Sequence, residues 1–326
     1  MTASPIPRQG SLRSRGSARF SAQTLRRISA VLPPEQAWGL WTSRRIVAGI
    51  MDAFGPPLTG LTVTGVDEKL PDDRRVVGEW VSSGTQSDAA AIYYLHGSGY
   101  ALCSARTHRR LAGWLSRLTR LPVFSIDYRL APRHPFPAAA DDVHAGWDWL
   151  RTVAGLAPEH IVVAGDSAGG HLAMDLLLHH ENREVPAGMA LFSPLVDLTF
   201  TLARAREAQR PDPAIRSVDA ARMIGMYSRG IDPTHPRLAH ELADCATLPP
   251  TLIQAGGAEM LSADAEHLAA ALTAAGGDCE LQIWPDQVHV FQALPRLAPE
   301  ATAAMTHAAA FIRKTLADTS TESMAG

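Results

Sequence analysis

A serine lies between closely spaced glycines in the motif Gly-Asp-Ser-Ala-Gly-Gly at residues 165–170. The apolar run at residues 160–164 before it is typical of a buried strand, and residues 171–178 after it favour a helix. In a strand, G-x-S-x-G, helix arrangement the serine occupies a sharp, strained turn that exposes its hydroxyl. Glycines on either side avoid collisions with neighbouring backbone. The pattern therefore predicts Ser167 as a nucleophile, in preference to a glycine-rich structural turn.

A nucleophilic serine also needs hydrogen-bond donors for the oxyanion that its attack creates. The strand-like run at residues 90–95 ends in His-Gly-Ser-Gly-Tyr at residues 96–100. Glycines directly after a strand allow successive N–H groups to point into one cavity. We expect the N–H groups of Gly97 and Ser98 to form an oxyanion hole with that of Ala168; the alternative is an ordinary turn at the strand end.

The base is expected in a loop after the last strand, where it can reach over the sheet edge. Residues 279–284 favour a strand, and the loop at residues 285–291 contains His289 among apolar residues. The chain has 13 histidines, so residue type alone decides nothing. Position and chain order select His289.

The acid that orients the base has more than one candidate. Glu259 lies in the loop at residues 256–261, after a strand-like run at residues 251–255. Asp264 lies in the first turn of a helix that Ser262 would cap, where a carboxylate simply stabilises the helix dipole. Asp286, three residues before His289, is expected to shape that turn. We prefer Glu259 as the acid and keep Asp264 as the alternative.

These motifs together resemble the bacterial hormone-sensitive-lipase-like carboxylesterases, a family with the α/β-hydrolase fold. The matching segments are His-Gly-Ser-Gly at residues 96–99, Asp-Tyr-Arg-Leu-Ala-Pro at 127–132 with His-Pro-Phe-Pro-Ala-Ala at 134–139, the serine motif at 165–170 and Trp-Pro-Asp-Gln-Val-His-Val-Phe at 284–291. The resemblance covers about residues 60 to 315. It implies a serine esterase that hydrolyses short- to medium-chain carboxylic esters through an acyl-enzyme.

The chain departs from the family pattern at three positions. Ser98 stands where the oxyanion motif usually has glycine, which leaves the N–H but narrows the pocket. Glu259 stands where the family commonly has aspartate, and a longer carboxylate can still reach an imidazole. Arg133 replaces a glutamate, which affects a structural ion pair rather than the chemistry.

The composition agrees with a soluble enzyme. The chain has 326 residues, 46% of them apolar, and a net charge of −3, so it shows no basic footprint for nucleic acid. Its three cysteines lack C-x-x-C spacing, which argues against a zinc site and a disulfide framework. No apolar run approaches the roughly 20 residues that span a bilayer. We predict a cytoplasmic protein without cofactor or metal, able to form a homodimer.

The N-terminus differs from the rest of the chain. Residues 1–34 contain no Asp or Glu, whereas six arginines recur there among serines. This composition mimics an organellar transit peptide but lacks the apolar segment of a secretory signal. We predict a disordered arm of about 20 residues followed by a helix from about Ala22. A basic arm that rests on an anionic membrane is a lesser alternative.

Strand-like and helix-like segments alternate along most of the chain. This predicts an α/β-hydrolase fold with a mostly parallel eight-stranded sheet, helices on both faces and an antiparallel pair that opens it. Strands are expected at residues 61–67, 75–81, 89–95, 122–128, 161–164, 188–192, 252–255 and 279–284, and helices at 107–119, 138–153, 170–180, 262–275 and 298–317.

Two segments interrupt the alternation and are expected to form a helical cap over the site. The predicted division is an N-terminal arm with cap helices at 1–58, the first part of the core at 59–197, a cap insertion at 198–242 and the second part of the core at 243–326. The same residues would serve an acyltransferase, and a hydrolase fold that has become a weakly catalytic ligand-binding protein is the other alternative.

Overall fold

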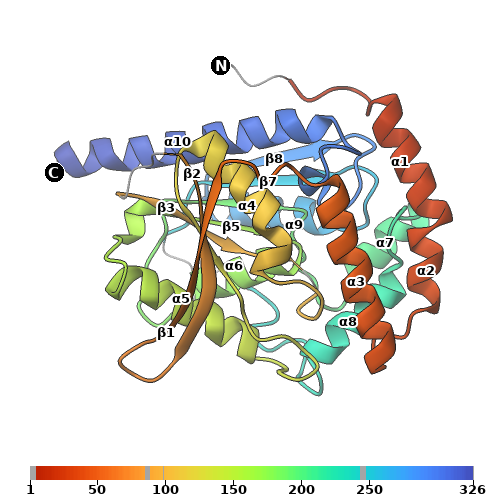
Figure 1. The fold of residues 1–326 in the computed structure, drawn as a ribbon, viewed down its shortest axis with the longest axis horizontal. Helices are drawn as coiled ribbons and strands as arrows, with labels where there is room; N and C mark the ends of the chain where they lie inside the picture. The colour runs from red at the N-terminus through yellow and green to blue at the C-terminus, as the bar shows by residue number, and fades with distance from the viewer. Residues whose placement is uncertain (1–4, 85–88, 98, 243–246, 326) are drawn as a thin grey trace.

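The computed structural model describes residues 5–84, 89–97, 99–242 and 247–325 (Figure 1). The expected oxyanion donor Ser98 and one of the three cysteines, Cys245, lie outside these ranges. Within them, one sheet of eight strands runs in the order β1-β2-β4-β3-β5-β6-β7-β8. The strands are β1 (Leu61–Lys69), β2 (Arg75–Ser83), β3 (Ala91–Leu95), β4 (Val123–Ile126), β5 (Ile161–Asp166), β6 (Gly188–Phe192), β7 (Thr251–Gly256) and β8 (Cys279–Trp284).

The pairing of the strands confirms the expected sheet. β1 pairs with β2 and β2 pairs with β4 in antiparallel register, whereas the other neighbours are parallel. Since β3 to β8 are parallel, their carboxyl ends share one edge, and the loops after β5, β6, β7 and β8 meet there. This edge carries every side chain of the candidate site.

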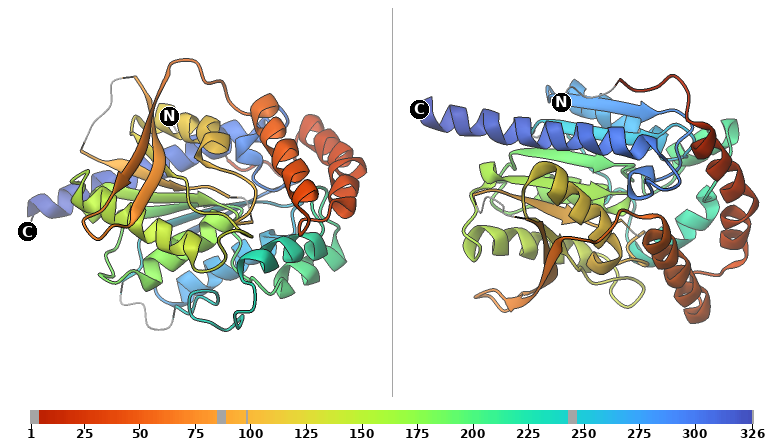
Figure 2. Two further views of the ribbon diagram at one scale, coloured as in Figure 1. Left: turned by 60° about the horizontal axis from the view of Figure 1, so that its bottom comes forward. Right: turned by 45° about the horizontal axis from the view of Figure 1, so that its top comes forward.

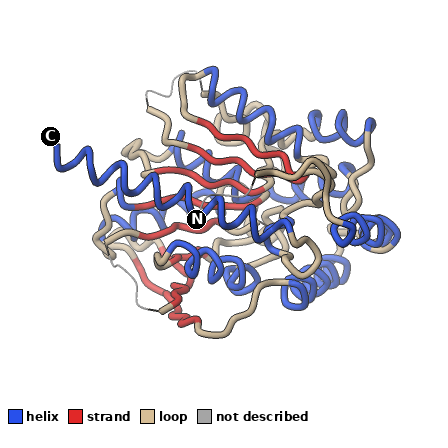
Figure 3. Tube along the Cα trace, turned by 90° about the horizontal axis from the view of Figure 1, so that it is seen from above, coloured by secondary structure: helices blue, strands red, loops and turns tan. Residues whose placement is uncertain are grey.

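Helices cover both faces of the sheet because residues within a strand alternate between two hydrophobic clusters. In β3, Ile92 and Tyr94 belong to the cluster on one face, and Tyr93 and Leu95 to the cluster on the other. The first face is covered by α4 (Ala105–Thr119) and α10 (Glu300–Ala325), and the second by α5 (Ala138–Thr152), α6 (Ala168–His179) and α9 (Ser262–Ala274). Figure 3 shows the strands between these layers.

Five further helices gather at one end of the molecule. They are α1 (Leu12–Gln23), α2 (Leu25–Val31) and α3 (Ala37–Phe54) from the N-terminal segment, and α7 (Thr201–Gln209) and α8 (Ser217–Tyr227) from the expected cap insertion. Figure 2 shows both groups beside the carboxyl edge of the sheet. Segments far apart in the chain therefore meet over the site. The exact domain boundaries remain a prediction.

The expected disordered arm is wrong, because α1 begins at Leu12 rather than near Ala22. Ser11 caps the helix by accepting a hydrogen bond from the Ser14 N–H. The carboxylate of Glu300, at the start of α10, accepts hydrogen bonds from the hydroxyls of Ser11 and Ser14 at 3.3 and 2.5 Å. On α2, Arg26 forms an ion pair with Glu207 of α7 at 2.8 Å. Contacts with distant parts of the chain thus hold this basic segment in helical form.

Within the described residues, no helix combines the length and the apolar character needed to cross a lipid bilayer.

Candidate active site

Ser167 occupies the turn between β5 and α6 with φ 52° and ψ −120°. A positive φ is strained for a residue with a Cβ, and such strain persists only where the surroundings enforce it. The flanking glycines are required sterically. A Cβ on Gly169 would lie 1.9 Å from the carbonyl oxygen of Leu95, and one on Gly165 would lie 2.8 Å from that of Gly169. The expected strand, strained serine and helix are therefore all present.

Glu259 and His289 form a hydrogen-bonded pair between Oε2 of the carboxylate and Nδ1 of the ring. The other carboxylate oxygen of Glu259 accepts hydrogen bonds from the Gly256 N–H at 2.5 Å and the Ser193 hydroxyl at 2.7 Å. Burial by itself lowers the pKa of His289, but the charge and hydrogen bond of Glu259 outweigh it, so the pKa is raised above 6.5. The pair therefore stabilises a protonated imidazole.

Ser193, which the sequence analysis did not single out, links the loops that carry this pair. Its hydroxyl donates to Glu259 and accepts a hydrogen bond from the Val290 N–H at 3.0 Å, directly after His289. Ser193 is buried and has φ 49°. It follows β6 at the carboxyl edge of the sheet, and this position is the signal that could have identified it.

Asp264 lies away from His289. Its Oδ1 accepts hydrogen bonds from the N–H groups of Val196 and Asp197, each at 2.9 Å. Burial raises the pKa of the Asp264 carboxyl to about 7. The structure thus brings Glu259, and not Asp264, to the histidine, and Asp264 supports the loop after β6 from inside the protein.

Two smaller expectations about these loops are tested by the geometry. Ser262 is not the N-cap of α9, because Leu261 occupies that position and the Ser262 hydroxyl donates to the Glu259 carbonyl at 2.9 Å. Asp286 does lie in a turn, with φ 60°. Its carboxylate accepts hydrogen bonds from the Gly10 N–H at 3.2 Å and from Arg210 at 3.1 Å.

The N–H group of Gly97, one of the expected oxyanion donors, forms a hydrogen bond within the protein. The Gly97 N–H donates to Oδ1 of Asp166 at 2.9 Å, so in this structure it holds the loop in position rather than pointing freely into the cavity. Asp166 also accepts a hydrogen bond from the Tyr94 hydroxyl at 2.6 Å, and its other oxygen lies 3.3 Å from Nε2 of His108. The carboxylate before the nucleophile therefore anchors the loop. Ser98 lies outside the described residues, and Ala168 begins α6 directly after Ser167.

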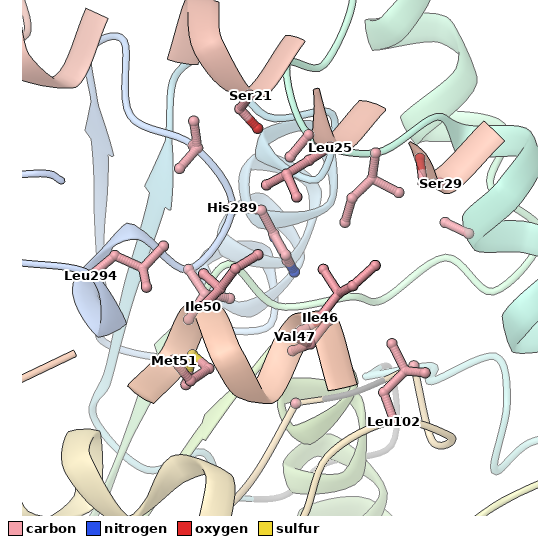
Figure 4. A pocket seen from close by; sticks show the side chains of 18 of the residues that line it. Ser21, Leu25, Ser29, Ile46, Val47, Ile50, Met51, Leu102, His289 and Leu294 are labelled. Carbon is pink, nitrogen blue, oxygen red and sulfur yellow. The ribbon is translucent and has the colours of Figure 1, made fainter. Parts of the chain in front are cut away.

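Ser167 and His289 line the same cavity, which has a volume of about 780 Å³. Figure 4 shows the His289 side chain facing apolar residues of the N-terminal helices. Most of the lining is apolar, with Asp166, Asp219 and His108 among its few ionisable members. The apolar lining residues include Leu25, Ile28, Ile46, Val47, Ile50, Met51, Phe54, Met223 and Ile224. A cavity of this kind suits an apolar molecule with one polar group near the edge of the sheet.

Comparison with known proteins agrees with this geometry. A family described as alpha/beta hydrolase fold matches residues 92–293. Esterase LipU of Mycobacterium tuberculosis is 38% identical over 74% of this chain and 82% of its own length. An acetyl-hydrolase of Streptomyces hygroscopicus is 35% identical over 74% of this chain and 83% of its own. An esterase structure from the bacterial hormone-sensitive lipase family superposes with a TM-score of 0.80 at 30% identity, covering 93% of this chain and 97% of that one.

The chain belongs to the bacterial hormone-sensitive-lipase-like alpha/beta hydrolases. The fold class and family expected from the motifs are confirmed. A second similar structure is that of EstE5 soaked with p-nitrophenyl butyrate, with a TM-score of 0.80, 30% identity and coverage of 94% and 99% of the two chains.

One cluster in this hydrolase has the spacing of metal ligands. Donor atoms of Asp175, His179 and His240 all lie within 4.8 Å of one another. Both carboxylate oxygens of Asp175 already accept hydrogen bonds from Arg237 at 2.9 Å, and a guanidinium at that distance repels a cation. Arg237 also pairs with Asp141 of α5 at 2.9 Å. The cluster therefore fits an ion-pair network that ties the segment after α8 to the core better than it fits a metal.

The Asp264→Asn variant should change stability in a pH-dependent way and retain activity. Asp264 holds its proton in the folded state up to a pKa of about 7, whereas the unfolded state releases it near 3.8. This group therefore lowers wild-type stability as pH rises between these values. The asparagine does not titrate, so the variant's free energy of unfolding should rise relative to that of the wild type as pH increases. The difference should grow by roughly 1–4 kcal/mol between pH 4 and pH 8. Denaturant unfolding across that range, with esterase assays alongside, measures both effects; strong loss of activity would contradict the assignment.

Proposed function

We propose that this hydrolase cleaves carboxylic esters by two-step acyl transfer, with Ser167 as the nucleophile and His289 as the general base. His289 takes the Ser167 proton while the hydroxyl oxygen attacks the ester carbonyl. The tetrahedral intermediate then expels the alcohol, which receives that proton, and leaves an acyl group on Ser167. Water activated by the same histidine releases the acid and restores the serine.

The observation that carries this proposal is the Glu259–His289 hydrogen bond at the cavity that Ser167 also lines. Glu259 holds the ring with Nδ1 toward the carboxylate, which directs Nε2 to the nucleophile. Its charge stabilises the imidazolium that forms at each transfer. Ser193 acts as a positioning residue, since its hydroxyl touches both the acid and the backbone after the base.

The oxyanion hole is proposed to use backbone N–H groups from two loops. Ala168 supplies one at the start of α6, where the helix dipole adds to the stabilisation of negative charge. Since Gly97 donates to Asp166, the remaining donors come from Ser98 and from Gly99, which lines the cavity. Gly97 instead holds the loop in position.

The acyl group is proposed to be short to medium in length. The Streptomyces relative is named an acetyl-hydrolase, and a similar structure was soaked with a butyrate ester, so these proteins support short acyl chains. The apolar cavity of about 780 Å³ has room for more than an acetyl group. A small-molecule ester is thus the proposed partner; the cytoplasmic location and the homodimer stay predictions.

Ser167→Ala should reduce ester hydrolysis by about 10³-fold or more, because no other group replaces the nucleophile. A fluorophosphonate probe should label the wild type at Ser167, as read by mass spectrometry of the modified peptide. Ser43→Ala, which also alters a cavity-lining serine, is the matched control and should retain labelling. Near-normal turnover of p-nitrophenyl butyrate by folded Ser167→Ala would refute the mechanism.

The pH dependence of kcat/KM should report the Glu259–His289 pair. The base must be neutral to accept a proton, so activity falls as pH drops through the His289 pKa, which is raised above 6.5. Glu259→Gln removes the charge that raises this pKa. The variant should lose about 10²–10⁴ in kcat, and the midpoint of its remaining activity should move to lower pH. An unchanged midpoint would show that Glu259 does not act on the base.

A series of p-nitrophenyl esters should show a preference for acyl chains of about two to eight carbons, because the cavity is bounded by the N-terminal helices. The measurement is kcat/KM against chain length, with each ester kept below its solubility limit. Faster turnover of long-chain triglyceride emulsions than of these soluble esters would contradict the proposed range.

A further inference from the structure

The N-terminal helices expose an unusual amount of apolar surface. Among the described residues, twelve large apolar side chains are exposed, and seven of them belong to the first 41 residues. Five define what we call the N-terminal apolar surface: Leu12, Phe20, Val31, Trp38 and Trp41, with exposed fractions of 82, 71, 73, 56 and 59%. Scattered single apolar residues are normal on a protein surface, but such a concentration marks an interaction site.

These side chains lie on helices that share one end of the molecule (Figures 1 and 2). Leu12 and Phe20 are eight residues apart on α1, which places them on the same side of the helix. Trp38 and Trp41 are three apart on α3, and the guanidinium of Arg45, one turn further, lies 5.3 Å from the Trp41 ring centre.

Positive charge surrounds this surface. Residues 1–34 contain six arginines and no acid. Arg13, Arg19 and Arg27 are exposed, and none of them forms an ion pair with another described residue. The acids that lie nearby are already engaged, since Glu35 pairs with Arg222 and Glu207 pairs with Arg26. The surface therefore combines exposed aromatic rings with uncompensated arginines.

The same surface reaches the mouth of the cavity. Phe20 and Ile28 are 71% and 40% exposed, yet both line the cavity that contains Ser167 and His289. A molecule that enters past these side chains would come from whatever covers the N-terminal apolar surface.

We propose that this surface docks the protein on an anionic lipid layer, with the cavity mouth facing the lipid. Tryptophan and arginine are the side chains that favour the membrane–water interface, where rings lie among head groups and cations meet anionic lipids. A second copy of this chain fits less well, because a symmetric interface would bring the same arginines against each other. Apolar esters that partition into the lipid would then reach Ser167 directly.

Vesicle flotation tests this proposal with the full-length Ser167→Ala protein, so that neither lipid hydrolysis nor failure of the proposed catalytic mechanism affects the result. The vesicles are phosphatidylcholine alone or phosphatidylcholine with about 30% phosphatidylglycerol. Binding is expected only to the anionic vesicles, and about 1 M salt should abolish most of it by screening. Brominated lipids should quench tryptophan fluorescence in the bound protein.

Two groups of variants separate the apolar and charged contributions. Trp38→Ser with Trp41→Ser should remove the quenching and weaken binding, and Arg13→Gln, Arg19→Gln and Arg27→Gln combined should weaken binding about 100-fold. The matched controls alter exposed residues elsewhere: Val63→Ser with Val153→Ser, and Arg133→Gln with Arg183→Gln and Arg229→Gln. In an otherwise wild-type background, all variants should hydrolyse soluble p-nitrophenyl butyrate normally.

Equal binding by the tryptophan variant and the wild type would overturn the proposal, as would equal loss in the control variants. Absence of binding to anionic vesicles would also overturn it. Light scattering of the lipid-free protein completes the test: a dimer that Trp38→Ser and Trp41→Ser dissociate would assign the surface to a second copy instead.

Discussion

The buried carboxylate of Glu259 is the group on which the site depends. A carboxylate away from water is costly unless hydrogen bonds and an opposite charge compensate it. Here the compensation comes from the Gly256 N–H, the Ser193 hydroxyl and the His289 ring. These donors lie at the end of β7 and in the loops after β6 and β8, and Glu259 itself lies in the loop after β7. Satisfying one buried charge therefore also fixes the relative positions of three loops at the carboxyl edge of the sheet.

A second buried carboxylate does the same for the other half of the site. Asp166 lies next to the nucleophile and accepts hydrogen bonds from Tyr94 in β3 and from the Gly97 backbone. The loop after β3 is thus tied to the strained turn at Ser167, whose geometry also relies on close approach between Gly169 and the end of β3. Both halves of the site use the same physical device, in which a desolvated anion collects donors from neighbouring loops.

The N-terminal helices connect this chemistry to the surroundings of the protein. Their inner side completes the wall of the cavity, and their outer side exposes tryptophans and arginines. Polar contacts link these helices to other parts of the chain, such as Ser14 with Glu300 of α10 and Arg26 with Glu207 of α7, and Leu40 and Met51 of α3 are buried in the hydrophobic core. Other apolar residues of these helices line the cavity on one side and, in our proposal, face lipid on the other.

The sequence by itself determined the features that depend on local patterns. Apolar β-branched runs between glycine-rich turns were sufficient to predict the eight strands, and the strand, serine motif and helix around Ser167 predicted the strained turn. The chain order of Glu259 and His289 after the last strands favoured this pair, because parallel strands bring their carboxyl ends together, but it left Asp264 open as an alternative acid. The family followed from the same motifs.

Only the tertiary structure decided where individual hydrogen bonds go. Gly97 looked like an oxyanion donor, but its N–H faces a carboxylate that lies 69 residues away in the chain. Ser193 showed no local signal beyond its position, since its partners come from two other loops. The basic N-terminus resembled a disordered arm because the contacts that make it helical, such as that between Ser14 and Glu300, span 286 residues. Such contacts depend on the packing of the whole sheet, and no local pattern encodes them.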